Sequence, residues 1–150
     1  PPRAGLRTGV FVDRVRDLGD MAIPHVTRGL ATGDYDNDGR IDVLCNNLNG
    51  PATLYHNESP DRNSWISIRL EGVKCNRDAI GARVTLSAGG RQQVREIQTG
   101  RGYLSASDPR ALFGVGKNTK IQSLQIRWPD GRSQTVTLPG IDRYLTIREG

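Results

Sequence analysis

The chain has 150 residues, enough for one hydrophobic core or for a compact domain with a smaller unit attached, but not for two large domains. Hydrophobic residues make up 35% of it, whereas glycine (18) and proline (8) are abundant. This balance favours short strands joined by turns over helices. No apolar run approaches the roughly 18 residues that span a bilayer, so we expect no membrane-spanning segment.

The formal net charge of +5 raises the question of nucleic-acid binding, because clustered cations release counterions from phosphate. The basic residues are instead scattered singly along the chain, and only Lys74, Lys117 and Lys120 are lysines. We therefore predict a dispersed basic surface and no nucleic-acid partner.

The first part of the chain predicts four short strands, over residues 9–15, 28–33, 41–46 and 52–57. A sheet this small is marginally stable alone. We expect it to pack on the rest of the chain or on propeller blades outside it, because a propeller closes only with several blades.

An acidic loop, Asp34-Tyr35-Asp36-Asn37-Asp38-Gly39-Arg40-Ile41-Asp42, lies between the second and third of these strands. The side chains of Asp34, Asp36 and Asp38 can converge if the backbone curls, Gly39 permits the sharp turn, and Asp42 closes the shell. Without a cation the four carboxylates would repel one another. Ca²⁺ accepts the mixed oxygen ligands of a flexible loop, whereas Mg²⁺ demands stricter geometry. The loop therefore predicts a Ca²⁺ site.

Position twelve distinguishes this loop from an EF-hand, whose first six positions it matches. An EF-hand requires a bidentate Glu there, and counting from Asp34 that position is Cys45. Residues 41–45 also continue as an apolar strand. We predict a strand-connecting calcium site that ends at Asp42. The alternative, an ordinary solvated turn, is disfavoured by four aspartates at this spacing.

The second part of the chain shows five sets of alternating apolar residues, each typical of a half-buried strand. The sets are Ile66, Ile68 and Leu70; Val84, Leu86 and Ala88; Leu124, Ile126 and Trp128; Val136 and Leu138; and Leu145 and Ile147. The short turns between them suit antiparallel hairpins. Residues 57–63 contain no apolar side chain, so we place a boundary there and predict domains 1–60 and 61–150. The predicted fold is all-β: an antiparallel sandwich or barrel-like C-terminal domain with a small N-terminal, propeller-blade-like sheet.

Two parts of the sequence resemble known families. Residues 28–31, the acidic loop and residues 43–47 resemble an FG-GAP, or integrin-type, propeller repeat. A second set of segments resembles the ASPIC/UnbV domain more specifically: residues 76–84, 102–105, 108–110, 113–116 and 127–131.

These resemblances imply a piece of a cartilage-acidic-protein-like repeat protein that is extracytoplasmic or secreted, with upstream propeller blades in the parent chain. They also imply the metal ligands. The side-chain oxygens of Asp34, Asp36, Asp38 and Asp42 would bind Ca²⁺, together with the main-chain carbonyl of Arg40.

The sequence offers little for catalysis. His25 and His56 are the only histidines, and no Gly-x-Ser-x-Gly elbow occurs. Cys45 lies on an apolar strand and is expected in the core. Cys45 and Cys75 either form one disulfide or remain buried free thiols, of which we favour the second. We therefore predict that the chain is not an enzyme.

Two further features allow a structural and a functional interpretation. The glycine-rich residues 100–105 let the backbone approach a neighbour, so that Arg101, Tyr103 and Asp108 could bind a polar ligand, but a strand bend or bulge is favoured. Trp128 completes an alternating set and is expected in the core, whereas Trp65 is expected over the seam between the two sheets.

The predicted function is a calcium-stabilised, non-catalytic binding or scaffolding module with a protein or carbohydrate partner. The alternative is an accessory protein or enzyme of enediyne-type natural-product biosynthesis, which rests on the UnbV resemblance alone.

Overall fold

The computed structural model describes residues 19–60, 63–117 and 120–150, and in these ranges the chain is all-β, as predicted. Apart from strands, the described residues form one short 3-10 helix, η2 (Gly19–Ala22). The strand predicted over residues 9–15 lies outside the described residues.

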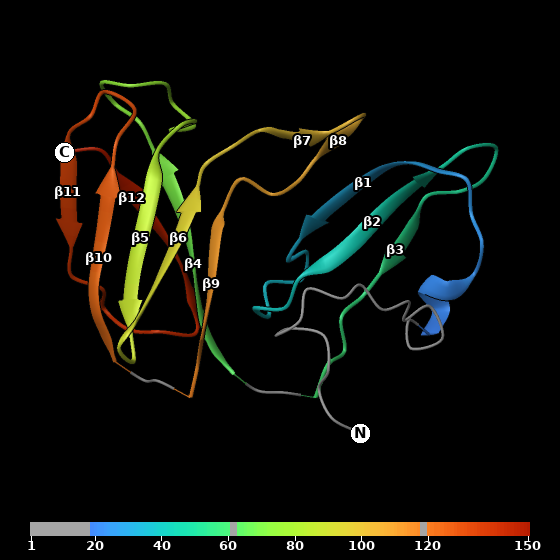
Figure 1. Cartoon of the computed structure of the whole chain (residues 1–150), viewed down its shortest axis with the longest axis horizontal. Helices are drawn as coiled ribbons and strands as arrows, with labels where there is room; N and C mark the ends of the chain where they lie inside the picture. Colours follow the sequence, from blue (N-terminus) through green and yellow to red (C-terminus); the bar gives the residue numbers. More distant parts are fainter. Residues whose placement is uncertain (1–18, 61–62, 118–119) are drawn as a thin grey trace, which may run out of the picture.

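The first sheet contains strands β1 (Thr27–Gly33), β2 (Asp42–Asn47) and β3 (Thr53–Tyr55), in the order β1-β2-β3. Both pairings are antiparallel, and Gly33 lies opposite Asp42 where β1 and β2 meet the acidic loop. Three of the four strands predicted in this part are thus confirmed. This sheet lies beside the rest of the molecule (Figure 1).

The rest of the described chain forms two facing sheets (Figure 1). One has the order β12-β4-β9, and the other has the order β11-β10-β5-β6. Their bounds are β4 (Ser64–Glu71), β5 (Arg83–Ala88), β6 (Arg91–Glu96), β9 (Ala111–Gly116), β10 (Ile121–Arg127), β11 (Ser133–Val136) and β12 (Arg143–Arg148). A hairpin of β7 (Gly100–Gly102) and β8 (Ser105–Ala106) extends from this sandwich to the side of β1.

The alternating apolar residues of the sequence fill the space between the two facing sheets. Ile66 and Ile68 of β4 and Phe113 of β9 pack in one core with Leu86 of β5 and Ile126 of β10, all of them fully buried. Among the described residues no sheet closes on itself as a barrel. Of the two predicted alternatives, sandwich and barrel, the structure therefore shows the sandwich.

Three details differ from the sequence predictions. Strands β12 and β4 pair in parallel, with Arg143 opposite Ile66, because the chain crosses from one sheet to the other before β12. Strand β11 ends at Val136, so Leu138 lies beyond it although it still packs against the core. Cys45 is buried, whereas Cys75 is only half-buried: it packs against the edge of the core and its N–H donates to Glu149. The prediction of two buried free thiols was therefore wrong for the burial of Cys75, although both cysteines are free.

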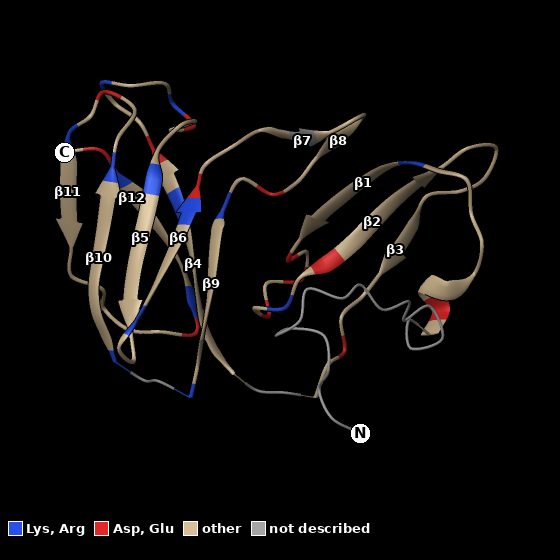
Figure 2. Ribbon diagram, in the orientation of Figure 1, with Lys and Arg blue, Asp and Glu red and all other residues tan. Residues whose placement is uncertain are grey.

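The charged residues are distributed differently in the two parts of the described chain. Basic residues lie on several strands of the sandwich, and on β10, β5 and β6 they lie side by side at one end, where Arg127 is opposite Arg83 (Figure 2). Acidic residues gather where the acidic loop enters β2 (Figure 2). No helix in the described part of the chain is long and apolar enough to cross a membrane.

Candidate metal centre

The acidic loop connects β1 to β2 and turns back on itself between Asp34 and Asp42. Two residues have a left-handed backbone, Asn37 with φ 64° and Gly39 with φ 88°. Gly39 also has no room for a side chain, because a Cβ there would lie 2.1 Å from Nε1 of Trp65. The predicted role of Gly39 in the turn is therefore accompanied by a packing requirement that the loop sequence does not reveal.

The two aspartates at the ends of the loop are buried, each with 3% of its surface exposed. Asp34 accepts backbone N–H groups within the loop: its Oδ1 accepts from Asp38 at 3.0 Å and its Oδ2 from Gly39 at 2.7 Å. A buried charge requires such partners or a cation. These bonds curl the backbone around the Asp34 carboxylate.

Asp42, the first residue of β2, ties the start of the loop to the segment that follows β3. Its Oδ2 accepts the N–H of Tyr35 at 3.0 Å, and its Oδ1 accepts the N–H of Asn57 at 2.8 Å. Each carboxylate oxygen has about two acceptor positions, so one position on each oxygen of Asp42 stays open for a further partner.

The structure brings three of the predicted ligands to one point. Asp34, Asp36 and Asp42 offer carboxylate oxygens that all lie within 4.8 Å of one another. Two oxygens bound to one Ca²⁺ at roughly 2.3–2.6 Å from the ion are at most about 4.6–5.2 Å apart. The spacing of these three oxygens therefore fits a single Ca²⁺ ion.

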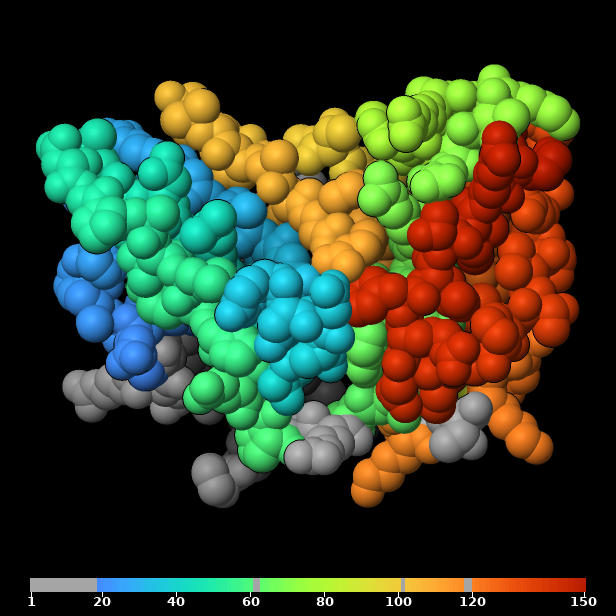
Figure 3. Space-filling model, turned by 180° about the vertical axis from the view of Figure 1, so that it is seen from behind, coloured from blue at the N-terminus to red at the C-terminus, as the bar shows by residue number. Residues whose placement is uncertain are grey.

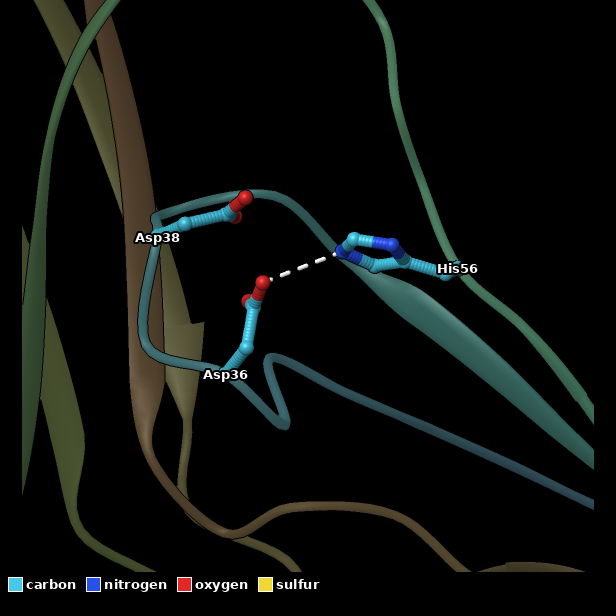
Figure 4. A group of neighbouring side chains, drawn as sticks. All are labelled: Asp36, Asp38 and His56. Carbon is cyan, nitrogen blue, oxygen red and sulfur yellow. Dashed lines mark hydrogen bonds and ion pairs between the residues drawn. The ribbon is translucent and has the colours of Figure 1, made fainter.

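A second group shares Asp36 with the first and adds a residue that the sequence did not connect to the loop. Asp36, Asp38 and His56 also offer ligand atoms within 4.8 Å of one another. Nε2 of His56 lies 3.0 Å from Oδ2 of Asp36, and the three side chains face one another across the turn (Figure 4). His56 reaches the loop because it directly follows β3, which pairs with β2.

Asp38 and Arg40 interact with each other. Oδ1 of Asp38 accepts the N–H of Arg40 at 2.8 Å, and its Oδ2 forms an ion pair with the Arg40 guanidinium. Oδ2 of Asp38 is buried and makes no hydrogen bond. Its cationic partner is the Arg40 guanidinium, so a metal ion at this oxygen would have to replace that ion pair. Ligation by the main-chain carbonyl of Arg40 stays a prediction.

The sandwich covers one side of the loop. The hydroxyl of Tyr144 on β12 donates to Oδ2 of Asp34. Arg110, just before β9, donates to the main-chain oxygen of Asp34 at 2.8 Å and to Oδ1 of Asn37 at 2.9 Å.

Trp65 packs on Gly39 and makes an edge-to-face contact with Tyr144, with ring centroids 5.0 Å apart, so it lies at the seam as predicted. Figure 3 shows the loop, in cyan, lying against the C-terminal segment, in red.

These contacts fix the protonation of the groups around Asp34. Burial raises the pKa of Tyr144, and its hydrogen bond to Asp34 raises it further, so the phenol stays protonated and acts as a donor. The hydrogen bond to Asp108 raises the pKa of Arg110, which keeps the guanidinium charged.

The other features singled out in the sequence do not join this centre. Residues 100–105 form the β7–β8 hairpin, in which Tyr103 is 76% exposed and Leu104 has φ 48°. Trp128 is buried in the sandwich core, as predicted.

Residues 72–150 match the family described as ASPIC and UnbV. The chain is 32% identical over 108 residues to Cartilage acidic protein 1 of Xenopus tropicalis, which covers 69% of the chain and 16% of that relative. It is 30% identical over 110 residues to the Homo sapiens protein of the same name, covering 71% of the chain and 16% of the relative. The Mus musculus protein is 29% identical over 127 residues, 81% of the chain and 19% of the relative. The chain thus spans less than a fifth of the length of these relatives.

Proposed function

The chain belongs to the ASPIC and UnbV family, and from this premise we propose that it is a calcium-stabilised, non-catalytic binding or scaffolding module of an extracytoplasmic repeat protein. In this proposal the ion holds the acidic loop in shape, and the sandwich presents a surface to a protein or carbohydrate partner. The first sheet is one repeat of the FG-GAP type, and further blades precede it in the parent protein.

The spacing of the loop oxygens is the observation that carries the proposal. The oxygens of Asp34, Asp36 and Asp42 lie within 4.8 Å of one another, and two of these residues are buried. Three carboxylates so close together in a partly buried place need a counter-charge. Oxygen ligands alone, on a flexible loop, suit Ca²⁺ better than Mg²⁺.

An extracytoplasmic location is supported by the relatives named cartilage acidic protein. Extracellular modules bind Ca²⁺ with dissociation constants of about 10⁻⁴–10⁻³ M, whereas cytosolic sites must be far tighter. The proposed location therefore predicts a dissociation constant in this weaker class for the loop.

Calorimetric titration of the metal-free chain with CaCl₂ tests the proposal. We expect one site in the chain, and we expect Asp36→Asn to weaken binding strongly, because Asp36 belongs to both ligand groups and accepts no backbone hydrogen bond that the fold needs. The matched control is Asp78→Asn, which removes one exposed carboxylate outside the loop. If the parent chain shows no heat at millimolar CaCl₂, the loop is a solvated turn and the proposal fails.

A further inference from the structure

The carboxylate of Asp34 is oriented by a side chain from the sandwich. Its Oδ2 accepts both the N–H of Gly39 and the hydroxyl of Tyr144, which fills the two acceptor positions of that oxygen. Its Oδ1 accepts only the N–H of Asp38, so one position stays open there. Tyr144 therefore determines which oxygen of Asp34 is left for a cation.

Arg110 holds the loop backbone without neutralising the loop. Its two contacts in the loop are neutral oxygens, the main-chain oxygen of Asp34 and the amide oxygen of Asn37. Its charge is balanced outside the loop by Asp108, whose Oδ2 lies 2.6 Å from Nε and 2.5 Å from Nη2 of Arg110. Arg110 thus forms no ion pair with Asp36 or Asp42 that a metal ion would have to displace.

Residues 105–110, the segment that contains Arg110, also cover the free edge of β1. The N–H groups of Leu30 and Thr32 donate to the hydroxyls of Ser105 at 2.9 Å and Ser107 at 3.1 Å. The N–H of Asp108 donates to the main-chain oxygen of Thr32 at 2.9 Å. An uncovered edge would leave these backbone groups without protein partners. Residues 105–110 therefore fix the first sheet and its loop at one position on the sandwich.

Aromatic contacts complete this junction. The Arg110 guanidinium lies over the Tyr144 ring at 4.4 Å, so the two residues that hold the loop also hold each other. The indole of Trp65 lies against Gly39 on the loop and against Tyr144 on β12. Trp65 is thus placed to report a change in the loop, whereas Trp128 lies in the sandwich core.

We propose that the calcium site is shared between the two parts of the chain: the first sheet supplies the ligands, and Tyr144 and Arg110 of the sandwich are positioning residues that set the affinity. This inference rests on the proposed calcium binding. By reciprocity, Ca²⁺ then fixes the sandwich against the first sheet, because any coupling between metal and junction acts in both directions.

The test compares Ca²⁺ affinities of variants that keep every ligand. We expect Tyr144→Phe and Arg110→Gln each to weaken binding about tenfold, which corresponds to about 1.4 kcal/mol, since the loop loses part of its preorganisation. The matched controls are Tyr103→Phe, on the β7–β8 hairpin, and Arg83→Gln, on β5. Both change exposed side chains that do not bond to the acidic loop, and both should alter the dissociation constant less than twofold, well below that factor of about ten. Titration is followed by calorimetry and, in parallel, by Trp fluorescence.

Each outcome decides the matter. If Tyr144→Phe and Arg110→Gln bind Ca²⁺ as tightly as the parent chain, or more tightly, the shared site is wrong although the calcium site itself stands. If the parent chain does not bind Ca²⁺, the proposed function has failed first. A general loss of structure is recognised from the far-ultraviolet spectrum of each metal-free variant. Should Arg110→Gln not fold, Tyr144→Phe, which removes a single oxygen, decides alone.

The fluorescence signal separates positioning from a merely structural role. In the parent chain the Ca²⁺-induced change should follow the same binding curve as the heat, and Trp65→Phe should abolish it. A fluorescence change that persists in Trp65→Phe would come from Trp128 and would contradict the junction described for Trp65.

Discussion

At the level of single residues, Gly39 meets two requirements at once. Its φ of 88° lies in the left-handed region, which costs other residues roughly 1–2 kcal/mol. Its Cα also faces the indole of Trp65, and a Cβ would lie 2.1–2.3 Å from three atoms of that ring. The first requirement follows from the loop sequence, whereas the second depends on the fold.

Gly39→Ala should therefore destabilise the chain more than the same substitution at another glycine with a left-handed backbone. Gly131 is the matched control, because its φ is 90° and a Cβ there would meet no atom within 4 Å. We expect Gly131→Ala to lower the free energy of unfolding by roughly 1–2 kcal/mol, and Gly39→Ala to lower it further. Urea denaturation of both variants measures the difference. Equal losses would mean that Trp65 moves aside at no cost.

At the level of elements, Glu149 fastens the end of β12 to the loop that follows β4. It is buried, and its Oε2 accepts the N–H groups of Val73 and Lys74 at 2.8 Å and of Cys75 at 3.0 Å. Its Oε1 pairs with Arg132. Burial by itself would raise the pKa of Glu149, but the N–H bonds outweigh it and lower the pKa to about 2.

This contact makes stability depend on pH in acid. Because the pKa of Glu149 is lower in the folded state than its ordinary value of 4.5, its ionisation stabilises the fold above about pH 4.5, and that contribution is lost as the pH falls towards about 2. Glu149→Gln should be less stable at neutral pH and should lose less on acidification. Denaturation midpoints across this range test it, with the exposed Glu96→Gln as control. A parallel decline in all three proteins would exclude Glu149 as the source.

The elements that the sequence predicted are those with alternating apolar residues. β9 alternates Ala111, Phe113 and Val115, but Gly114 and Gly116 on its other face resemble turn residues, so it was not predicted as a strand. β6 has one apolar residue, Val94, because it is an edge strand that β5 holds by backbone hydrogen bonds. The parallel pairing of β12 depends on a crossover between sheets, which no local pattern encodes.

The residues of the candidate site also fall into two groups: those that a local sequence pattern predicts and those that only the fold brings to the loop. Asp34, Asp36 and Asp42 could be predicted because their convergence depends on a short loop. His56 could not, since it reaches Asp36 only through the register of β2 with β3. Tyr144 lies 110 residues from Asp34, and its position depends on the assembled sandwich. Long-range positions of this kind carry no signal in the spacing of residues.

At the level of the whole molecule, Ca²⁺ should stabilise the first sheet most and the sandwich through the junction. Ligand at about 100 times its dissociation constant adds about 2.7 kcal/mol to the unit that unfolds with the site. We expect amide exchange with Ca²⁺, compared with chelator, to slow most in β2, next at Asp108, whose N–H bonds to Thr32, and least near Ile126 in the core.

The pattern of exchange discriminates between arrangements of the chain. Equal slowing in β2 and near Ile126 would establish one cooperative unit and contradict a boundary at residues 57–63. Slowing in β2 without any change at Asp108 would leave the first sheet independent of the sandwich. The chelated chain at the same ionic strength is the control.

The parallel pairing of β12 with β4 has a consequence for the order in which the chain folds as it leaves the ribosome. β1 to β3 and the acidic loop emerge complete, but β4 receives its parallel neighbour only when residues 143–148 have been made. Until then Asp34 has no Tyr144 beside it, because Tyr144 follows Asp34 by 110 residues. Pairings so distant in sequence form slowly. During this interval, the carboxylates of the nascent loop have only the loop's own N–H groups, the nearby Arg40, His56 and Asn57, and ions from the surrounding solution as partners.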